Sequence, residues 1–507
     1  MNIKQAKQEI TNTLKAYLAK DQLGNYLIPT VRQRPVLLMG PPGVGKTQIM
    51  EQIAAETGVG LVAYTITHHT RQSAIGLPFI EKRTYGGEEV SVTEYTMSEI
   101  LSSVYRLMER TGLQEGILFL DEINCVSETL APMMLQFLQC KTFGNQALPE
   151  GWLIVAAGNP PEYNKSVRDF DVVTLDRVKR IDVEEDYGVW KEYARRKNLH
   201  GAILSYLDIK KDNFYRIENT ADGLQFATAR GWEDLSELLY AYETLGIRAD
   251  REVVGQYIQM PRIAKDFANY LEMFYKYQKT YHVEGILSGT WENITVLELR
   301  EAPFDEKLSV MGLVLSRLSE EARNTRCQDA LTDALHTSLT EFREKIADAP
   351  PLTVLDQLLW KRRTAMKQAK EAGQLDKESR DLKQREINAL EDYRQRLDRE
   401  AVAPEGAMDA VRGWFGEEVE RRKAMAMETK DMFDNAFRFL ETTFGDSQEL
   451  VIFVTEITVG YNTSWFVEQF GCDAYFRHNR ELLFDSTRHR IREEIAAAKA
   501  AEQEENT

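Results

Sequence analysis

Cysteine is scarce in this chain of 507 residues, and its four cysteines are spread widely over the sequence. They are Cys125, Cys140, Cys327 and Cys472, and none belongs to a C-x-x-C pair. This spacing argues against both a cysteine-rich zinc site and a disulfide-stapled secreted domain. A reducing compartment, the cytoplasm, is therefore the expected location.

Long apolar runs are also missing. The first ten residues, MNIKQAKQEI, contain no apolar segment of the kind found in signal peptides. No run elsewhere approaches the roughly 20 apolar residues that span a bilayer. We therefore expect no association with a membrane.

An excess of basic charge is lacking as well, because the formal net charge is −17. Binding to duplex DNA depends on Lys and Arg side chains that neutralise phosphates. The acidic balance therefore disfavours a nucleic-acid partner, although it does not exclude a local basic patch.

The first part of the sequence does contain a series of short apolar runs separated by helical patterns. Each run has the length of a buried strand, and the alternation of such strands with helices predicts a parallel sheet covered on both faces. The expected fold class is therefore α/β, with a doubly wound sheet. The four runs are Val36–Met39, Leu61–Ile66, Ile117–Leu120 and Leu153–Ala157.

Two hairpins are expected to interrupt this alternation. One folds about Gly86-Gly87, and the other spans residues 141–152. From about residue 187 helical patterns dominate, and residues 355–400 are typical of two helices joined near Gly373. The apolar segment Leu450–Tyr461 fits either a strand or a buried helix.

The segment after the first apolar run has the pattern G-x-x-x-x-G-K-[ST]. It lies between a predicted strand and a predicted helix, which is the context in which this pattern binds phosphates. Its backbone N–H groups and the helix N-terminus attract the phosphates, its lysine reaches the β- and γ-phosphates, and its threonine ligates Mg²⁺. The N-K-x-D pattern of GTPases is absent from the sequence, so the predicted cofactors are ATP and Mg²⁺. The nucleotide-binding residues are Gly40, Pro41, Pro42, Gly43, Val44, Gly45, Lys46, Thr47 and the following Gln48.

Two carboxylates, Asp121 and Glu122, follow the apolar run at 117–120. Asp121 is predicted to hold the metal together with Thr47, and Glu122 to polarise the attacking water. Asn159 follows the next apolar run, in AAGNP, and its side chain is expected beside the acidic pair, where it can orient the water. The alternatives are a solvated strand end for the acidic pair and an Asn-Pro turn for Asn159.

Taken together, these motifs resemble the MoxR branch of the AAA+ ATPases, which carries a helix-2 insert. The resemblance covers residues 1–283, through GPPGVGKT, LFLDEIN, AAGNP, LDRV and TARGWEDL in that order. It implies a nucleotide-binding α/β domain with a five-stranded sheet at 1–186 and a helical lid at 187–283. Residues 284–507 match no motif, and we expect a mostly helical domain there that binds a partner or client.

The resemblance also assigns roles to two polar residues near the nucleotide. Asn159 corresponds to the sensor 1 residue of the family. Arg230 corresponds to sensor 2 on the lid, although Thr228-Ala229 precede it where the family usually has Ser-Pro. A charge on the lid surface is the alternative for Arg230.

Arg177, in LDRV, corresponds to the arginine finger of the family. It would reach the γ-phosphate bound by the neighbouring subunit and stabilise the charge of the transition state. A surface arginine paired with Asp176 or Asp182 is the alternative. Three nearby basic residues also remain candidates for the finger, namely Arg168, Lys179 and Arg180.

Members of this branch are expected to work as rings of identical subunits, here a hexamer, with a separate protein that carries a von Willebrand factor A-type domain. The favoured function is an ATPase whose motion remodels or matures a protein client. Two other classes stay open. One is an ATP-gated scaffold with slow turnover, and the other is a nucleic-acid-associated motor, which the acidic charge disfavours.

Overall fold

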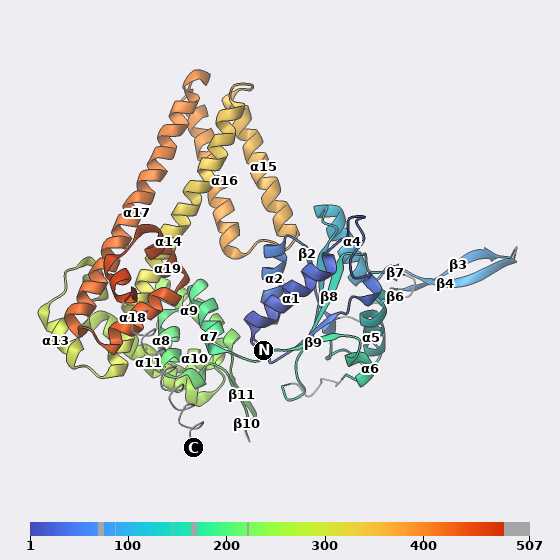
Figure 1. Cartoon of the computed structure of the whole chain (residues 1–507), viewed down its shortest axis with the longest axis horizontal. Coiled ribbons are helices and arrows are strands. Elements are labelled where there is room, and N and C mark those ends of the chain that lie inside the picture. Colours follow the sequence, from blue (N-terminus) through green and yellow to red (C-terminus); the bar gives the residue numbers. More distant parts are fainter. Residues whose placement is uncertain (69–75, 87, 144–145, 164–169, 221–222, 481–507) are drawn as a thin grey trace, which may run out of the picture. The chain divides into compact units, whose positions relative to one another are not determined.

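The structure is a computed structural model that describes residues 1–68, 76–86, 88–143, 146–163, 170–220 and 223–480 (Figure 1). The chain forms two compact units. The first combines Met1–Val189 with Phe342–Ala401, and the second combines Trp190–Glu341 with Val402–Thr507.

A parallel five-stranded sheet forms the centre of the first unit, with the strand order β2-β5-β8-β1-β9. The predicted α/β class with a doubly wound sheet is therefore confirmed. Four of the strands coincide with the four apolar runs. The fifth, β9, has the sequence KRID and pairs with β1. The strands are β1 (Val36–Met39), β2 (Gly60–Thr65), β5 (Gly116–Asp121), β8 (Trp152–Gly158) and β9 (Lys179–Asp182).

Helices cover both faces of this sheet (Figure 1). Successive residues of a strand point to opposite faces, and in β5 Ile117 and Phe119 pack into one core while Leu118 and Leu120 pack into the other. This is why each strand reads as a continuous apolar run. One face is covered by α1 (Ile3–Leu18) and α2 (Lys46–Thr57), and the other by α4 (Glu99–Thr111) and α5 (Ala131–Cys140).

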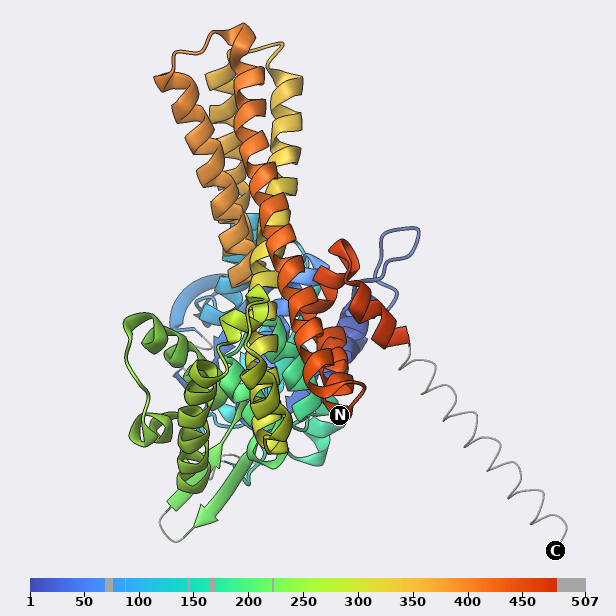
Figure 2. The same ribbon diagram turned by 90° about the vertical axis from the view of Figure 1, so that its left-hand side faces the viewer.

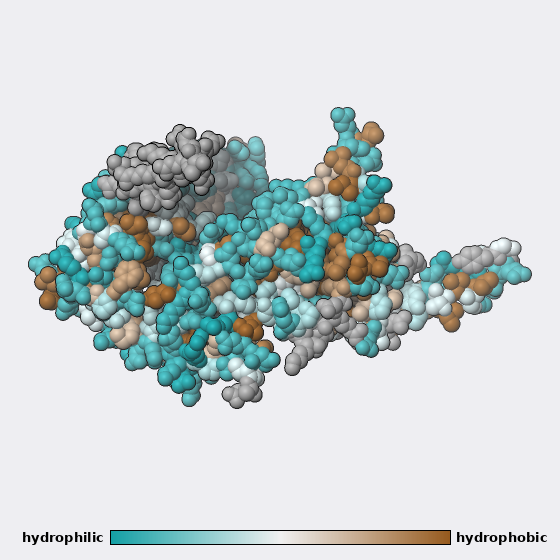
Figure 3. Space-filling view, turned by 60° about the horizontal axis from the view of Figure 1, so that its bottom comes forward, coloured by the Kyte–Doolittle hydropathy of each residue, from teal (hydrophilic) through white to brown (hydrophobic). Residues whose placement is uncertain are grey.

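Both predicted hairpins are present. The first consists of β3 (Pro78–Tyr85) and β4 (Glu88–Tyr95), which pair in antiparallel register with Tyr85 opposite Glu88. It carries exposed apolar side chains, among them Phe79, Ile80 and Val90, and Figure 3 shows hydrophobic residues on this protruding hairpin. The second hairpin is shorter, with β6 (Thr142–Phe143) and β7 (Gln146–Ala147) leading into β8.

An antiparallel helix pair from the C-terminal half also belongs to the first unit. As predicted, α15 (Pro351–Glu371) and α16 (Lys377–Arg399) are joined at Gly373. Their connection packs against the start of β2, because Gln374 Nε2 donates a hydrogen bond of 3.3 Å to the carbonyl of Val59. Glu371 forms an ion pair of 2.6 Å with Arg110 on α4. The helix pair of α15 and α16 thus contacts the sheet at its β2 edge and also contacts α4.

The second unit is largely helical. Two long helices, α14 (Phe304–Lys345) and α17 (Ala407–Phe444), lie side by side (Figure 2). Their contact includes a buried pair of hydroxyls, Thr325 and Thr429, whose oxygens are 2.9 Å apart. Other described elements of this unit are α7 (Tyr187–Arg196), which begins in the first unit, α8 (Gly201–Ile209), β10 (Arg216–Thr220), β11 (Gly223–Ala227), α9 (Ala229–Leu245), α10 (Arg251–Tyr257), α11 (Pro261–Thr280), α12 (Val283–Ser288), α13 (Asn293–Glu301), α18 (Gln448–Val459) and α19 (Tyr461–Phe470).

The structure resolves the ambiguity of the segment Leu450–Tyr461, most of which lies in helix α18. Among the described helices, none is by itself long and apolar enough to cross a membrane. In the part of the chain that the structure describes, α18 and α19 taken together reach that length and composition, with a bend of 88° between them.

Candidate nucleotide-binding site

The loop between β1 and α2 begins at the carboxyl edge of the sheet. Gly40 follows β1 directly, and a Cβ atom there would lie 2.9 Å from the carbonyl oxygen of Val183, so only glycine fits beside this backbone. Gly43 and Gly45 have φ angles of +79° and +93°, which glycine adopts at little cost. The chain can therefore curl tightly before α2 begins at Lys46, and the first N–H groups of α2 face the loop without intrahelical partners. This is the arrangement that binds phosphate.

Lys46 is buried inside this loop, with 8% of its surface exposed. Its ammonium group donates hydrogen bonds to the carbonyls of Gly40 and Pro41, at 2.7 and 2.9 Å, and to Oδ1 of Asn159, at 2.8 Å. Three acceptors therefore compensate for the burial of the charge. A bound phosphate would replace some of these neutral acceptors with negatively charged oxygens.

The hydroxyl of Thr47 donates a hydrogen bond of 3.1 Å to Oδ2 of Asp121, at the end of β5. Adjacent oxygen ligands of an octahedral Mg²⁺, each about 2.1 Å from the metal, lie about 3 Å apart. The two oxygens are of the hard type that Mg²⁺ prefers, and their separation matches one edge of its coordination shell. Thr47 and Asp121 therefore fit the metal-binding role predicted for them.

Glu122 lies one residue beyond the end of β5 and has a φ angle of +57°. Non-glycine residues pay a conformational cost in this region and often occur there at functional sites. Its backbone N–H donates to Oδ1 of Asp121 at 2.9 Å, and its carboxylate accepts a hydrogen bond of 2.9 Å from the hydroxyl of Thr67. Thr67 follows β2, the strand beside β5. The carboxylate of Glu122 is thus held on the β2 side of the site.

Asn159 follows β8, which lies between β5 and β1 in the sheet. This position places its side chain beside Lys46, at the same sheet edge as Asp121. The backbone of Asn159 forms hydrogen bonds with the side-chain amide of Asn124, a buried residue three positions after Asp121. Asn159 and Asp121 are among the residues that the sequence pointed to, whereas Thr67 and Asn124 are not; their one sequence signal is a polar residue shortly after a strand.

Arg177 is exposed and lies just after the short helix α6 (Val172–Leu175). It donates a hydrogen bond to Oε1 of Gln139 on α5 rather than to Asp176 or Asp182. Hydrogen bonds from Thr174 hold the pKa of the neighbouring Asp171 carboxyl below its usual value, and the charge of Arg177 contributes to the same effect. Because Arg177 is exposed, its guanidinium is accessible from outside the unit.

The other finger candidates differ from Arg177 in their partners. Lys179 forms an ion pair of 2.5 Å with Glu9 on α1, and Arg180 forms one of 2.8 Å with Asp182. Arg168 lies outside the described residues. Arg230 is exposed in the first turn of α9, a helix of the second unit, whose N-terminus is capped by Thr228. Apart from Arg177 and Arg230, the predicted site residues therefore lie together at one edge of the sheet in the first unit.

The part of the chain that contains this site matches a known protein family. Residues 35–178 match the family of AAA domains of the dynein-related subfamily. Many solved structures match as well, among them one of a proposed ATPase from Cytophaga hutchinsonii, with 17% sequence identity and a TM-score of 0.22. That match covers 36% of this chain and 52% of the Cytophaga chain, about half of its length. No curated protein matches this chain.

Proposed function

We propose that this chain, in which residues 35–178 match AAA domains of the dynein-related subfamily, is a MoxR-like AAA+ ATPase that hydrolyses ATP to remodel or mature a protein client. The observation that carries the proposal is the convergence of three strand ends on one point. Lys46 contacts Asn159 at 2.8 Å, and Thr47 contacts Asp121 at 3.1 Å. A phosphate-binding lysine, a metal-binding pair and a polar residue able to orient water are thereby assembled at one sheet edge.

Each residue has a separate task in the proposed reaction. The N-terminus of α2 and Lys46 bind the phosphates, while Thr47 and Asp121 would hold Mg²⁺. Bound Mg²⁺ would neutralise charge on the β- and γ-phosphates. Glu122 orients and polarises the attacking water once its carboxylate turns from Thr67 towards the nucleotide, and Asn159 fixes the opposite side of that water.

Arg177 would complete the site of a neighbouring subunit in a homo-oligomeric ring, proposed to be a hexamer. Arg177 is exposed and donates its hydrogen bond to the uncharged side chain of Gln139, which favours it over Lys179 and Arg180, because these two are held by carboxylates. Arg230 would sense the nucleotide from the lid. A separate protein with a von Willebrand factor A-type domain is a further proposed partner, and the cytoplasm is the proposed location.

Substitution of Glu122 tests the proposed hydrolysis. Glu122→Gln keeps the size of the side chain but removes its ability to take up a proton, so we expect unchanged ATP affinity and a loss of steady-state phosphate release. Glu150→Gln, at an exposed position of the same domain, is the matched control and should retain normal turnover. Normal hydrolysis by Glu122→Gln would refute the assigned role.

A mixing experiment tests whether Arg177 acts between subunits. Lys46→Ala subunits should not bind ATP, and Arg177→Ala subunits should bind it without turnover. A mixture should recover activity, because the intact Arg177 of a Lys46→Ala subunit completes the ATP-bound site of a neighbouring Arg177→Ala subunit. Arg180→Ala is the control and should be active alone. No recovery in mixed assemblies would exclude a finger that acts in trans.

A second function, an ATP-gated scaffold with slow turnover, is favoured by one observation. Thr67 holds the carboxylate of Glu122 at 2.9 Å in the structure. If this hydrogen bond persisted with ATP bound, the chain would assemble on ATP but hydrolyse it slowly. For such a scaffold, Thr67→Val should raise ATP turnover, because it removes the hydrogen bond that holds Glu122. For an ATPase that releases Glu122 readily, the same substitution should leave turnover nearly unchanged.

A further inference from the structure

Asn124 lies in the loop after β5, and only 3% of its surface is exposed. Both ends of its side-chain amide bond to the backbone of one residue, Asn159. Its Nδ2 donates to the carbonyl of Asn159 at 2.8 Å, and its Oδ1 accepts from the N–H of Asn159 at 3.3 Å. The amide thus pairs with the backbone of Asn159 much as a neighbouring strand would.

The surroundings of Asn124 are shaped to admit this side chain. A Cβ atom on Gly158 would lie 2.6 Å from Oδ1 of Asn124 and 2.9 Å from its Cγ, so the contact requires glycine at the end of β8. The N–H of Ile123 also donates to the carbonyl of Ala157 at 2.9 Å. Pairing with β8 therefore continues beyond the end of β5, first through the backbone of Ile123 and then through the Asn124 side chain.

The position of Asn159 depends on this continuation. Asn159 lies just beyond the last residue of β8, where the ladder of the sheet no longer fixes the backbone. Its side-chain oxygen nevertheless meets the ammonium of Lys46 at 2.8 Å. Asn124 supplies two of the hydrogen bonds that orient the peptide groups on either side of the Asn159 Cα atom.

We infer that Asn124 is a positioning residue for ATP hydrolysis, which holds Asn159 in the place where its amide can meet both Lys46 and the attacking water. The inference rests on the proposed function. Asparagine is required because only an amide offers a donor and an acceptor at this length. Aspartate lacks the donor and would place a charged oxygen against the Asn159 carbonyl. Glutamine is too long for the space next to Gly158.

The test compares Asn124→Ala and Asn124→Asp with the wild-type chain. Misplacement of a reacting group by about 1 Å can lower turnover on the order of 100-fold, so we expect kcat to fall by at least about tenfold. The affinity for ATP, measured by titration with a fluorescent analogue, should change by less than about threefold, since Asn124 does not touch the phosphate loop. Asn213→Ala is the control. It removes a comparable hydrogen bond of 2.7 Å, to the hydroxyl of Tyr206, and should leave kcat unchanged.

A double-mutant cycle separates positioning from mere stability. If Asn124 acts through Asn159, then Asn124→Ala should lower kcat in the wild-type background but not in Asn159→Ala. Equal, multiplicative losses in both backgrounds would overturn the inference while leaving the proposed hydrolysis intact. A wild-type chain without ATPase activity would overturn both.

Gly158→Ala provides a second route if the Asn124 variants fold poorly. The added methyl group must displace the Asn124 amide, so kcat should fall while the affinity for ATP stays the same. In an Asn124→Ala background the clash with the amide is removed and only the flexible side chain of Met39, whose Sδ lies 3.1 Å from the added Cβ, must adjust, so the same substitution should have little further effect. A Gly158→Ala chain with normal kcat would contradict the inference.

Discussion

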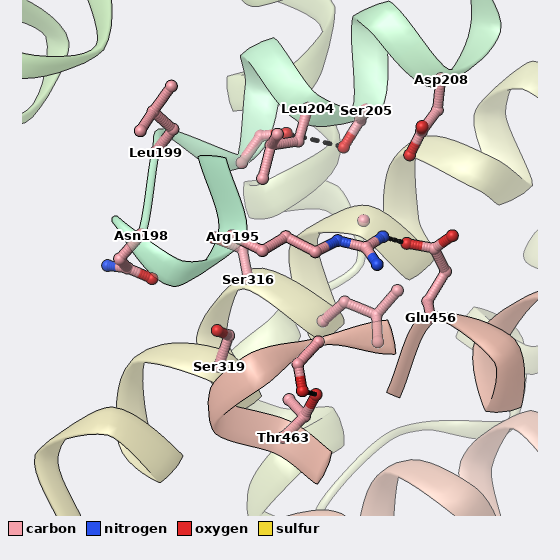
Figure 4. A pocket seen from close by; sticks show the side chains of 14 residues that line it. Arg195, Asn198, Leu199, Leu204, Ser205, Asp208, Ser316, Ser319, Glu456 and Thr463 are labelled. Atoms are coloured by element: carbon pink, nitrogen blue, oxygen red, sulfur yellow. Dashed lines mark hydrogen bonds and ion pairs between the residues drawn. The ribbon is translucent and has the colours of Figure 1, made fainter. Parts of the chain in front are cut away.

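A cluster of four charges in the second unit supports a quantitative prediction about stability. Glu456 on α18 forms an ion pair of 3.0 Å with Lys191 and a second with Arg195, both on α7. Lys191 also pairs with Asp208 on α8 at 2.5 Å. Figure 4 shows Arg195 pointing at Glu456 beside a cavity, whose volume of about 70 Å³ has room for a few water molecules only. These charges therefore depend on one another for compensation.

Removal of Glu456 should be costly because its partners are hidden from solvent. The side chains of Arg195, Lys191 and Glu456 are 12%, 14% and 17% exposed. Breaking a buried pair by deleting one partner typically costs about 3–5 kcal/mol, because the other charge stays buried. For a domain of this size 1 kcal/mol lowers the melting temperature by about 2–4 °C. Glu456→Ala should therefore lower the melting temperature of the second unit by roughly 6–20 °C.

Thermal unfolding followed by circular dichroism at pH 7 measures this effect. The control is Glu420→Ala, which breaks the exposed pair between Glu420 and Lys423 and should cause no measurable change, because exposed pairs contribute little. A second test joins Glu456→Leu with Arg195→Met. Replacing a buried pair with apolar side chains is often neutral, so most of the lost stability should return. Melting of Glu456→Ala within 2 °C of the wild type would refute this reasoning, with the threshold set by the roughly 2–4 °C expected per kcal/mol.

Three further predictions concern the first unit. Lys46→Met should weaken ATP binding by roughly 100-fold or more, since charge-assisted hydrogen bonds to phosphate are worth about 1.5–3 kcal/mol each. The control is Lys7→Met, which removes a lysine that hydrogen-bonds Gln52 and Glu56 on α2 and should not weaken ATP binding in the same titration. Burial lowers the pKa of Lys141 from 10.5 to about 8, so the unfolded state binds more protons between these values and the stability contribution of Lys141 rises with pH across that window, by up to about 3 kcal/mol. Lys141→Met should therefore flatten the increase in urea resistance from about pH 8 to 9.5, and an unchanged slope would contradict the assigned cause. Gly40→Ala should destabilise the unit by about 1–3 kcal/mol in urea unfolding, because its methyl group would press on the backbone of Val183; a wild-type midpoint would show that the two segments separate at no cost.

The elements that the sequence predicted well are those with a signal inside one short segment. The phosphate loop is recognisable because its glycines, lysine and threonine are close together and lie between a strand and a helix. The first hairpin is recognisable from its two-residue glycine turn between alternating strands. The two helices at α15 and α16 are recognisable from long helical patterns on either side of Gly373.

Other elements were undetermined because short segments carry too little information. β9 has only four residues, three of them charged, and becomes a strand because β1 offers it an open edge. The pair β10 and β11 in the second unit falls in a region whose sequence indicated helices. The apolar segment at α18 could have formed either kind of element, since periodicity does not distinguish a buried strand from a buried helix. Its packing in a helical unit decided the outcome.

The sequence by itself therefore determined which groups are available for chemistry: a lysine and a threonine on a phosphate loop, two carboxylates after one strand, and an asparagine after another. Only the tertiary structure decided which of these groups touch. The strand order places β8 between β1 and β5, so Asn159 meets Lys46 and is reached by Asn124, and it places β2 beside β5, so Thr67 holds Glu122. These partners are separated by 35 to 113 residues along the chain. Local sequence cannot encode such contacts, because they depend on which strands become neighbours when the whole sheet assembles between the two cores on its faces.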